Sequence, residues 1–132
     1  MSILEDIVSR ARPDYQRDNF DAFLKKVGFS YNIPSIHVTG TNGKGSIGYL
    51  LEHSLANSKI KTGRFLSPAV TDEREIILVN GKMVPKTVWE RFLSEIILRI
   101  EDKDLKATAF EIEFVLSLLI FKELNCELVI LE

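Results

Sequence analysis

The sequence has few of the features that mark secreted, membrane-bound or nucleic-acid-binding proteins. Its one cysteine, Cys126, cannot form a disulfide within the chain, and no histidine lies near it in sequence. Acidic and basic residues are interspersed and sum to a net charge of -2, so no basic field favours nucleic acid or an anionic membrane. The N-terminus lacks a secretory signal pattern, and no segment approaches the roughly 20 apolar residues of a membrane span. We therefore expect a cytoplasmic protein that binds neither nucleic acid nor membrane, with Cys126 as a small core residue.

The composition is typical of a single soluble domain. The chain has 132 residues, of which 45% are hydrophobic and 27% are charged. This length and this balance allow one domain with a real core. The sequence shows no internal repeat, low-complexity tract or linker.

Strand-forming patterns predict three short strands, over residues 34–39, 62–66 and 127–131, of which the last is an apolar run. A helix between the first two implies that they are parallel and joined by a right-handed crossover. Alternating residues around Asn80-Gly81 predict a β-hairpin over 75–84, because both turn positions tolerate positive φ. The predicted fold is therefore a three-layer α/β domain, a parallel sheet flanked by helices with an added hairpin.

Helical spacing of apolar residues predicts five helices, over 2–11, 17–27, from Lys44 onward, 85–101 and 109–124. The helix from Lys44 is expected to bury a stripe of four residues, Ile47, Leu50, Leu51 and Leu55. The helix over 109–124 is apolar almost all round, which indicates a buried helix.

A glycine-rich loop joins the first predicted strand to the helix that begins at Lys44. Unpaired N–H groups and the dipole at a helix N-terminus attract phosphate, and Lys44 adds a mobile positive charge. Ser46 or Thr41 could add a hydroxyl to phosphate or magnesium. The candidate ATP-binding residues are Gly40, Thr41, Asn42, Gly43, Lys44, Gly45 and Ser46.

Spacing alone leaves this loop open to two readings. The generic phosphate-loop motif places glycine six residues before its lysine and Ser or Thr just after it, whereas this chain has Val38 and Gly45 there. A Gly-Asn-Gly turn before a helix is also common as a purely structural turn that binds no ligand. Phosphate binding and a structural turn are both compatible with the residues.

The run Ile36 to Ser46 resembles the nucleotide-binding signature of the Mur ligase superfamily. Its Lys44-Gly45-Ser46 ending is similar to the folylpolyglutamate synthase and dihydrofolate synthase branch. The resemblance extends from Phe20 to Glu132 through four further segments: Leu66-Ser67-Pro68, Glu75 with Val79-Asn80-Gly81, Thr108-Ala109-Phe110-Glu111, and Val129-Ile130-Leu131-Glu132. The sequence departs from the family pattern at Ala69 and Ile76, where histidine and arginine are common.

The resemblance implies a truncated Mur-ligase-like ATPase domain of the P-loop type. Residues 1–132 would be a partial N-terminal ATP-binding domain, without the C-terminal glutamate-binding domain. The implied activity of the parent is ATP- and magnesium-dependent addition of L-glutamate to a folate or dihydropteroate, through an acyl phosphate. No catalytic nucleophile is expected, and the 132-residue chain alone is expected to be inactive.

The resemblance also assigns roles to three residues, each with a structural alternative. Ser67, at the carboxyl end of the second strand, would bind magnesium, or it is a turn residue before Pro68. Glu132 would be a second magnesium ligand, or it is a solvated chain end. Glu111 is a possible accessory residue, or a buried polar contact.

Three further expectations concern the chain as a whole. The loop after Pro68 is expected to be a mobile substrate lid. An uncovered sheet edge and apolar helix predict self-association, with residues 102–108 as the hinge. The rival functions are a cell-wall Mur ligase, which Lys44-Gly45-Ser46 disfavours, and a nucleotide-binding module without catalysis.

Overall fold

A computed structural model describes residues 2–9, 17–26, 28, 30–40, 43–67, 71–99 and 108–132. The chain divides into two compact units. One contains the sheet and comprises Tyr31–Val84 and Ile120–Glu132. The other is helical and comprises Met1–Ser30 and Pro85–Leu119.

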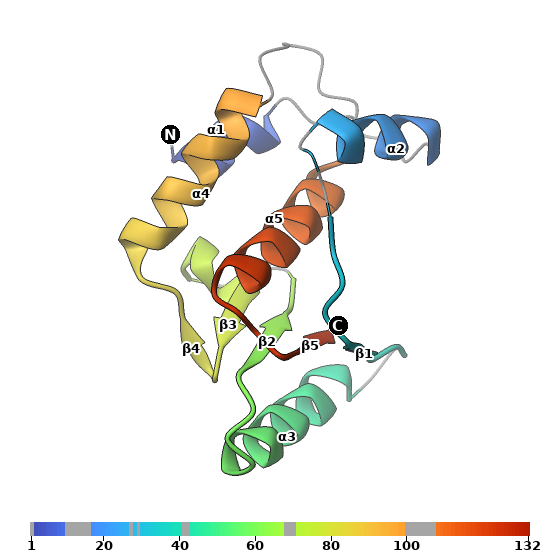
Figure 1. Cartoon of the computed structure of the whole chain (residues 1–132), viewed down its shortest axis with the longest axis vertical. Coiled ribbons are helices and arrows are strands. Elements are labelled where there is room, and N and C mark those ends of the chain that lie inside the picture. Colours follow the sequence, from blue (N-terminus) through green and yellow to red (C-terminus); the bar gives the residue numbers. More distant parts are fainter. Residues whose placement is uncertain are drawn as a thin grey trace. The chain divides into compact units, whose positions relative to one another are not determined.

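The sheet unit contains a mixed five-stranded sheet in the order β1-β5-β2-β3-β4 (Figure 1). The three predicted strands lie side by side and parallel, with β5 in the middle. The hairpin strands extend the sheet in the antiparallel sense from β2. The strand bounds are Ser35–His37 (β1), Thr62–Phe65 (β2), Ile77–Val79 (β3), Lys82–Met83 (β4) and Leu128–Leu131 (β5). The α/β class and the parallel strands are thus confirmed, the whole sheet is mixed, and the three-layer arrangement stays a prediction.

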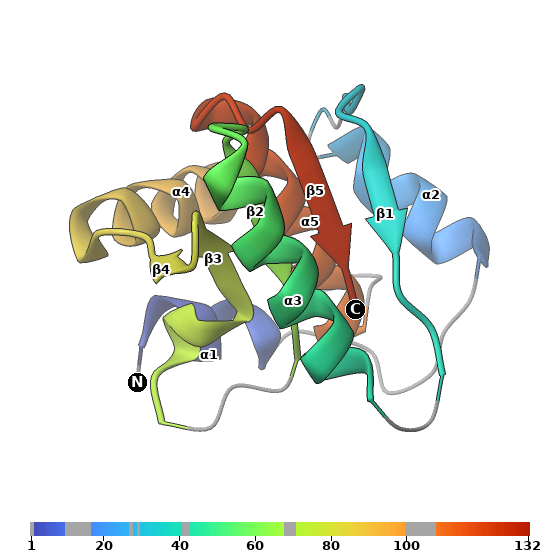
Figure 2. The same cartoon turned by 90° about the horizontal axis from the view of Figure 1, so that it is seen from below.

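Burial explains why β5 takes the central position. Val129 and Ile130 are completely buried, and Phe65 on the neighbouring β2 is 1% exposed. A continuous apolar run is what a strand needs when both of its faces are covered. Helix α3, Lys44–Asn57, contacts β2 and β5 and runs along one face of the sheet (Figure 2). The ring of Phe121 lies directly over Gly63 of β2, so the end of α5 also packs on this sheet.

The hairpin forms at the predicted turn but begins later than expected. Asn80 and Gly81 have φ of 51° and 79°, the values that a two-residue hairpin turn requires. Glu75 and Ile76 belong to a 3-10 helix, η1 (Glu73–Ile76), and not to the predicted strand. The reason is local, because Asp72 caps η1 and the Glu75 carboxylate bonds back to the Asp72 N–H at 3.2 Å.

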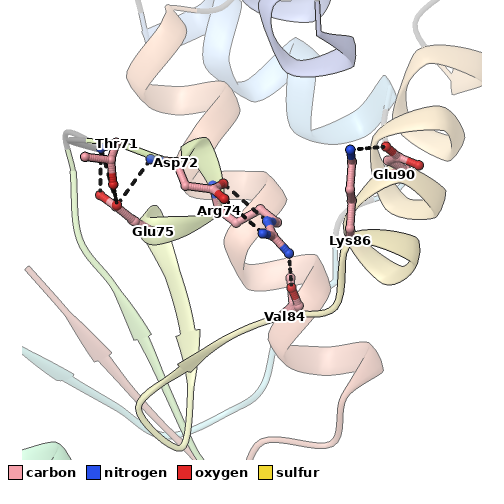
Figure 3. A network of polar contacts seen from close by, with 7 residues as sticks. All are labelled: Thr71, Asp72, Arg74, Glu75, Val84, Lys86 and Glu90. Carbon is pink, nitrogen blue, oxygen red and sulfur yellow. Dashed lines mark hydrogen bonds and ion pairs between the residues drawn. The ribbon is translucent and has the colours of Figure 1, made fainter.

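Hydrogen bonds and an ion pair hold this capped turn in place (Figure 3). Arg74 Nη2 lies 2.9 Å from Asp72 Oδ2, and Arg74 Nη1 donates to the Val84 carbonyl at 3.3 Å. Thr71 donates from its N–H and its hydroxyl to Glu75. Residues 71–76 therefore form a hydrogen-bonded turn. The lid expected after Pro68 covers residues 68–70, which lie outside the described residues, and the start of this turn up to Arg74; its mobility stays a prediction.

Four helices begin in the helical unit, and all were predicted with small shifts of their ends. They are α1 (Ile3–Val8), α2 (Arg17–Lys26), α4 (Lys86–Arg99) and α5 (Ala109–Glu123). Trp89 and Phe92 of α4 are buried, as expected for core residues. The prediction that α5 is a buried helix is confirmed by six buried apolar residues, Ile112, Val115, Leu116, Leu118, Ile120 and Phe121. Within the described ranges, no helix has the length and hydropathy needed to cross a membrane.

Cys126 provides a first test of this core. The residue is 6% exposed, and burial raises the pKa of its thiol to about 11. Because only the thiolate reacts with alkylating agents, Cys126 should be labelled by iodoacetamide at pH 8 at least about tenfold more slowly in the folded chain than in urea. Mass spectrometry over time measures this directly. Equal rates in both states would contradict the buried position.

Candidate functional site

The carboxyl ends of the three parallel strands meet at one edge of the sheet. The Val38 N–H donates to the Leu131 carbonyl at 2.7 Å, and the Glu132 N–H donates to the Phe65 carbonyl at 3.1 Å. Gly40 and Ser67 each lie two residues beyond these pairings, and Glu132 belongs to one of them. Ligands of α/β sheets bind at this kind of edge. The structure thus places the described part of the glycine loop, Ser67 and Glu132 along the same edge of the sheet.

The described part of the glycine loop is shaped as an anion site requires. Gly43 adopts a left-handed φ of 79° and is the N-cap of α3, so no side chain occupies the cap. The first turn of α3 contains no acidic residue. Its N–H groups therefore remain available to an anion, and Lys44 lies beside them. Thr41 and Asn42 lie outside the described residues.

There is also room for a phosphate. A Cβ added at Gly43 or at Gly45 would meet no heavy atom of the described residues within 4 Å. Gly40, Gly43, Gly45 and Ser46 are exposed, and Lys44 is half-buried. The protein's own packing thus does not require glycine at position 45, whereas close approach of a ligand would. The residues present fit a nucleotide phosphate.

Behind this loop lies a buried ion-pair cluster that the sequence analysis did not anticipate. Arg64 of β2 is 5% exposed. Its Nε and Nη2 both lie 2.9 Å from Glu132 Oε1, and its Nη1 lies 3.4 Å from Oε1 of Glu52 on α3. Nη2 also donates to the Gly45 carbonyl at 3.0 Å. One guanidinium thus joins the first turn of α3, the body of α3 and the end of β5.

Gly48 makes room for the Glu132 carboxylate in this cluster. A Cβ at Gly48 would lie 1.6 Å from Glu132 Oε1 and 3.1 Å from Arg64 Nε. No real contact is that short, so any larger residue at position 48 must displace the carboxylate.

Because of this cluster, α3 packs through a different face from the one that the sequence predicted. The buried residues of this helix are Gly48 and Glu52, whereas Ile47 and Leu50 of the predicted apolar stripe are 51% and 63% exposed. Leu51 and Leu55 are half-buried. The prediction for Ile47 and Leu50 was wrong because the helix turns its glycine and its carboxylate toward a buried arginine. The signal that could have revealed it is Arg64 itself, a charged residue inside the predicted strand whose described part is Thr62–Phe65.

Ser67 and Glu132 supply a hydroxyl and a carboxylate, the hard oxygen donors that magnesium prefers. Glu132 is not a solvated chain end, since its side chain is 9% exposed and paired with Arg64. Ser67 is exposed. Among the described residues, no group of three His, Cys, Asp or Glu side chains could hold a metal. The donor chemistry fits magnesium, and the role of both residues stays a prediction.

Glu111 is buried, as the sequence suggested, and it has a structural task. Its carboxylate accepts from the Thr108 N–H at 3.2 Å, and its own N–H donates to the Thr108 hydroxyl at 3.3 Å. This reciprocal pair is a capping box that starts α5. Its Oε1 is buried without a partner among the described residues. An accessory role for Glu111 stays a prediction.

Comparison with known proteins gives a consistent result, although no family model matches. The chain is 31% identical over 106 residues to the mitochondrial folylpolyglutamate synthase of Cricetulus griseus, covering 76% of this chain and 18% of that protein. It superposes on the crystal structure of Helicobacter pylori folylpolyglutamate synthetase with a TM-score of 0.81 and 30% identity. That match covers 98% of this chain and 34% of the other.

A second solved structure, Escherichia coli FolC in complex with DHPP and ADP, matches with a TM-score of 0.82 and 27% identity. It covers 99% of this chain and 33% of that one. The chain therefore spans about a third or less of the length of the proteins that it resembles.

Gly48 gives a direct test of the cluster. Gly48→Ala should lower the free energy of unfolding by about 2 kcal/mol, because the loss of a buried ion pair outweighs the gain in helix propensity of about 1 kcal/mol. Gly45→Ala on the same helix is the matched control and should be neutral or slightly stabilising, since its Cβ meets nothing. Urea denaturation of both variants measures the difference. Equal stabilities would show that Glu132 does not occupy the space beside Gly48.

Proposed function

We propose, because this chain is a homologue of folylpolyglutamate/dihydrofolate synthases over about a third of their length, that it carries the ATP phosphate site of such a ligase. The supporting observation is the glycine loop, which ends at an uncapped N-terminus of α3 with open space at Gly45. That loop lies at the carboxyl edge of the sheet beside Glu132. The ADP named in the Escherichia coli complex agrees with this use of the fold.

The residues of the loop would bind and orient the phosphates. The first-turn N–H groups of α3 would donate to phosphate oxygens, and Lys44 would neutralise part of their charge. The hydroxyls of Thr41 and Ser46 are further donors. Held in this way, the terminal phosphoryl group is presented outward from the sheet edge, where an acceptor can approach it in line.

The reaction that we propose for the whole enzyme joins L-glutamate to a folate or dihydropteroate. The terminal phosphoryl group of ATP passes to a carboxylate oxygen of the pterin substrate, and ADP leaves. The amino group of glutamate then attacks the acyl carbon, an amide forms, and inorganic phosphate leaves. Such chemistry needs positioned donors rather than a side-chain nucleophile, which agrees with the residues of this edge.

A magnesium ion, when bound, would neutralise charge on the phosphates and bridge them to the protein. Ser67 and Glu132 are the residues that we propose would hold it. Arg64 fixes the Glu132 carboxylate at this edge in the structure described above.

Two rival functions make different predictions. A cell-wall Mur ligase is less well supported, because the relatives found are folate ligases. A nucleotide-binding module without catalysis is the other rival. An assay of ADP release with ATP, magnesium, folate and glutamate distinguishes a folate ligase from a module without catalysis. We expect this chain to bind ATP without turnover, and turnover would contradict the module. Self-association remains a separate prediction.

The phosphate site is tested by two substitutions in the glycine loop. Lys44→Ala should weaken ATP about 10- to 100-fold, since a hydrogen bond to a charged group contributes about 1.5–3 kcal/mol. Gly45→Ala should also weaken ATP while leaving stability unchanged, because its methyl group would occupy the ligand's space. Calorimetric titration measures both affinities. Ser54→Ala, exposed further along α3, is the control. Unchanged affinity in Lys44→Ala would count against this site.

A further inference from the structure

The ion-pair cluster behind the loop holds two carboxylates and only one cation. Glu52 and Glu132 share the guanidinium of Arg64, and all three side chains are less than 10% exposed. Glu52 Oε2 is buried and has no hydrogen-bond partner among the residues that the structure describes. Removing charges from water is costly unless they are fully paired, so this cluster is short of one positive charge.

The two carboxylates are not held equally. Glu132 Oε1 accepts a hydrogen bond from Arg64 Nε at 2.9 Å and lies 2.9 Å from Nη2, whereas Glu52 Oε1 lies 3.4 Å from Nη1 alone. The Glu52 carboxylate can therefore accept further hydrogen bonds from the neighbouring guanidinium. Arg64 has a second carboxylate to which it can turn without leaving the core.

Arg64 also reaches the proposed phosphate loop. Its Nη2 donates to the carbonyl of Gly45, in the first turn of α3. Through this one side chain, the loop that would hold phosphate is connected to the carboxylate that would face a cation.

From these contacts we propose that Arg64 is a positioning residue that competes with a divalent cation for Glu132. When the cation takes the Glu132 carboxylate, the guanidinium passes to Glu52 and remains buried. The idea rests on the proposed function, because it takes Glu132 as the cation-binding residue. Like charges at the same carboxylate repel, so Arg64 weakens cation binding and Glu52 offsets that effect.

Two variants should then change cation affinity in opposite directions. Arg64→Met keeps the length of the side chain but removes the competing charge, and should raise affinity for Mn²⁺, used as a probe for magnesium, by roughly tenfold or more. Glu52→Gln removes the reserve carboxylate, leaves Arg64 dependent on Glu132, and should lower Mn²⁺ affinity severalfold. Electron paramagnetic resonance of free Mn²⁺, titrated with the 132-residue chain without nucleotide, measures both.

Arg91→Met is the control for general loss of positive charge, since Arg91 is exposed on α4. A merely structural Arg64 would give lower Mn²⁺ affinity in both test variants, and that result would overturn the proposal. So would absence of Mn²⁺ binding in every variant. If Arg64→Met fails to fold by circular dichroism, Glu52→Gln decides, and unchanged or higher affinity there rejects the competition.

The proposed function is tested separately by ATP affinity of the unmodified chain without metal. If ATP does not bind, the phosphate site is wrong, while the Mn²⁺ series still decides on Arg64. If ATP binds and the Mn²⁺ series shows no opposite shifts, the phosphate site stands and the competition is rejected.

Discussion

The buried guanidinium of Arg64 is the interaction on which the arrangement of the sheet edge depends. It contacts the end of β5 through Glu132, the middle of α3 through Glu52 and the start of α3 through Gly45. Breaking a buried ion pair by removing one partner typically costs about 3–5 kcal/mol, because the remaining charge is left uncompensated. A charged group in the second strand therefore sets which face of α3 meets the sheet and where the Glu132 carboxylate lies.

Charge is arranged at this edge in two layers. The N-terminus of α3 and Lys44 favour an anion, whereas the carboxylates of Glu52 and Glu132 directly behind favour a cation. Arg64 separates the two and compensates one carboxylate. A phosphate with its counter-ion would complement both layers at once, and this complementarity is a physical reason for the site that we propose.

The sequence predicted the parts of the fold that local pattern determines. Short strand-forming segments located β1, β2 and β5, the Asn80-Gly81 pair located the hairpin turn, and the all-round apolar pattern located α5. The glycine loop and the common edge followed from strand order. Local pattern mispredicted burial where a residue distant in sequence determines it. Ile47 and Leu50 were placed in the core because helical periodicity cannot reveal a buried arginine 14 or more residues away. Alternation placed Glu75 in a strand, whereas its bond to the Asp72 N–H holds it in η1.

The small volume at position 48 also bears on how such a site diverges. Gly48, Arg64 and Glu132 occupy one shared space, so an exchange at any of them changes what the other two can be. An apolar residue in place of Arg64 would release the carboxylate and admit a methyl group or more at position 48, whereas a side chain at 48 with Arg64 retained would leave a buried cation with a single partner. Among homologous chains, these three positions are expected to vary together. Covariation between positions 48 and 64 would reveal a spatial contact that the residue types alone do not indicate.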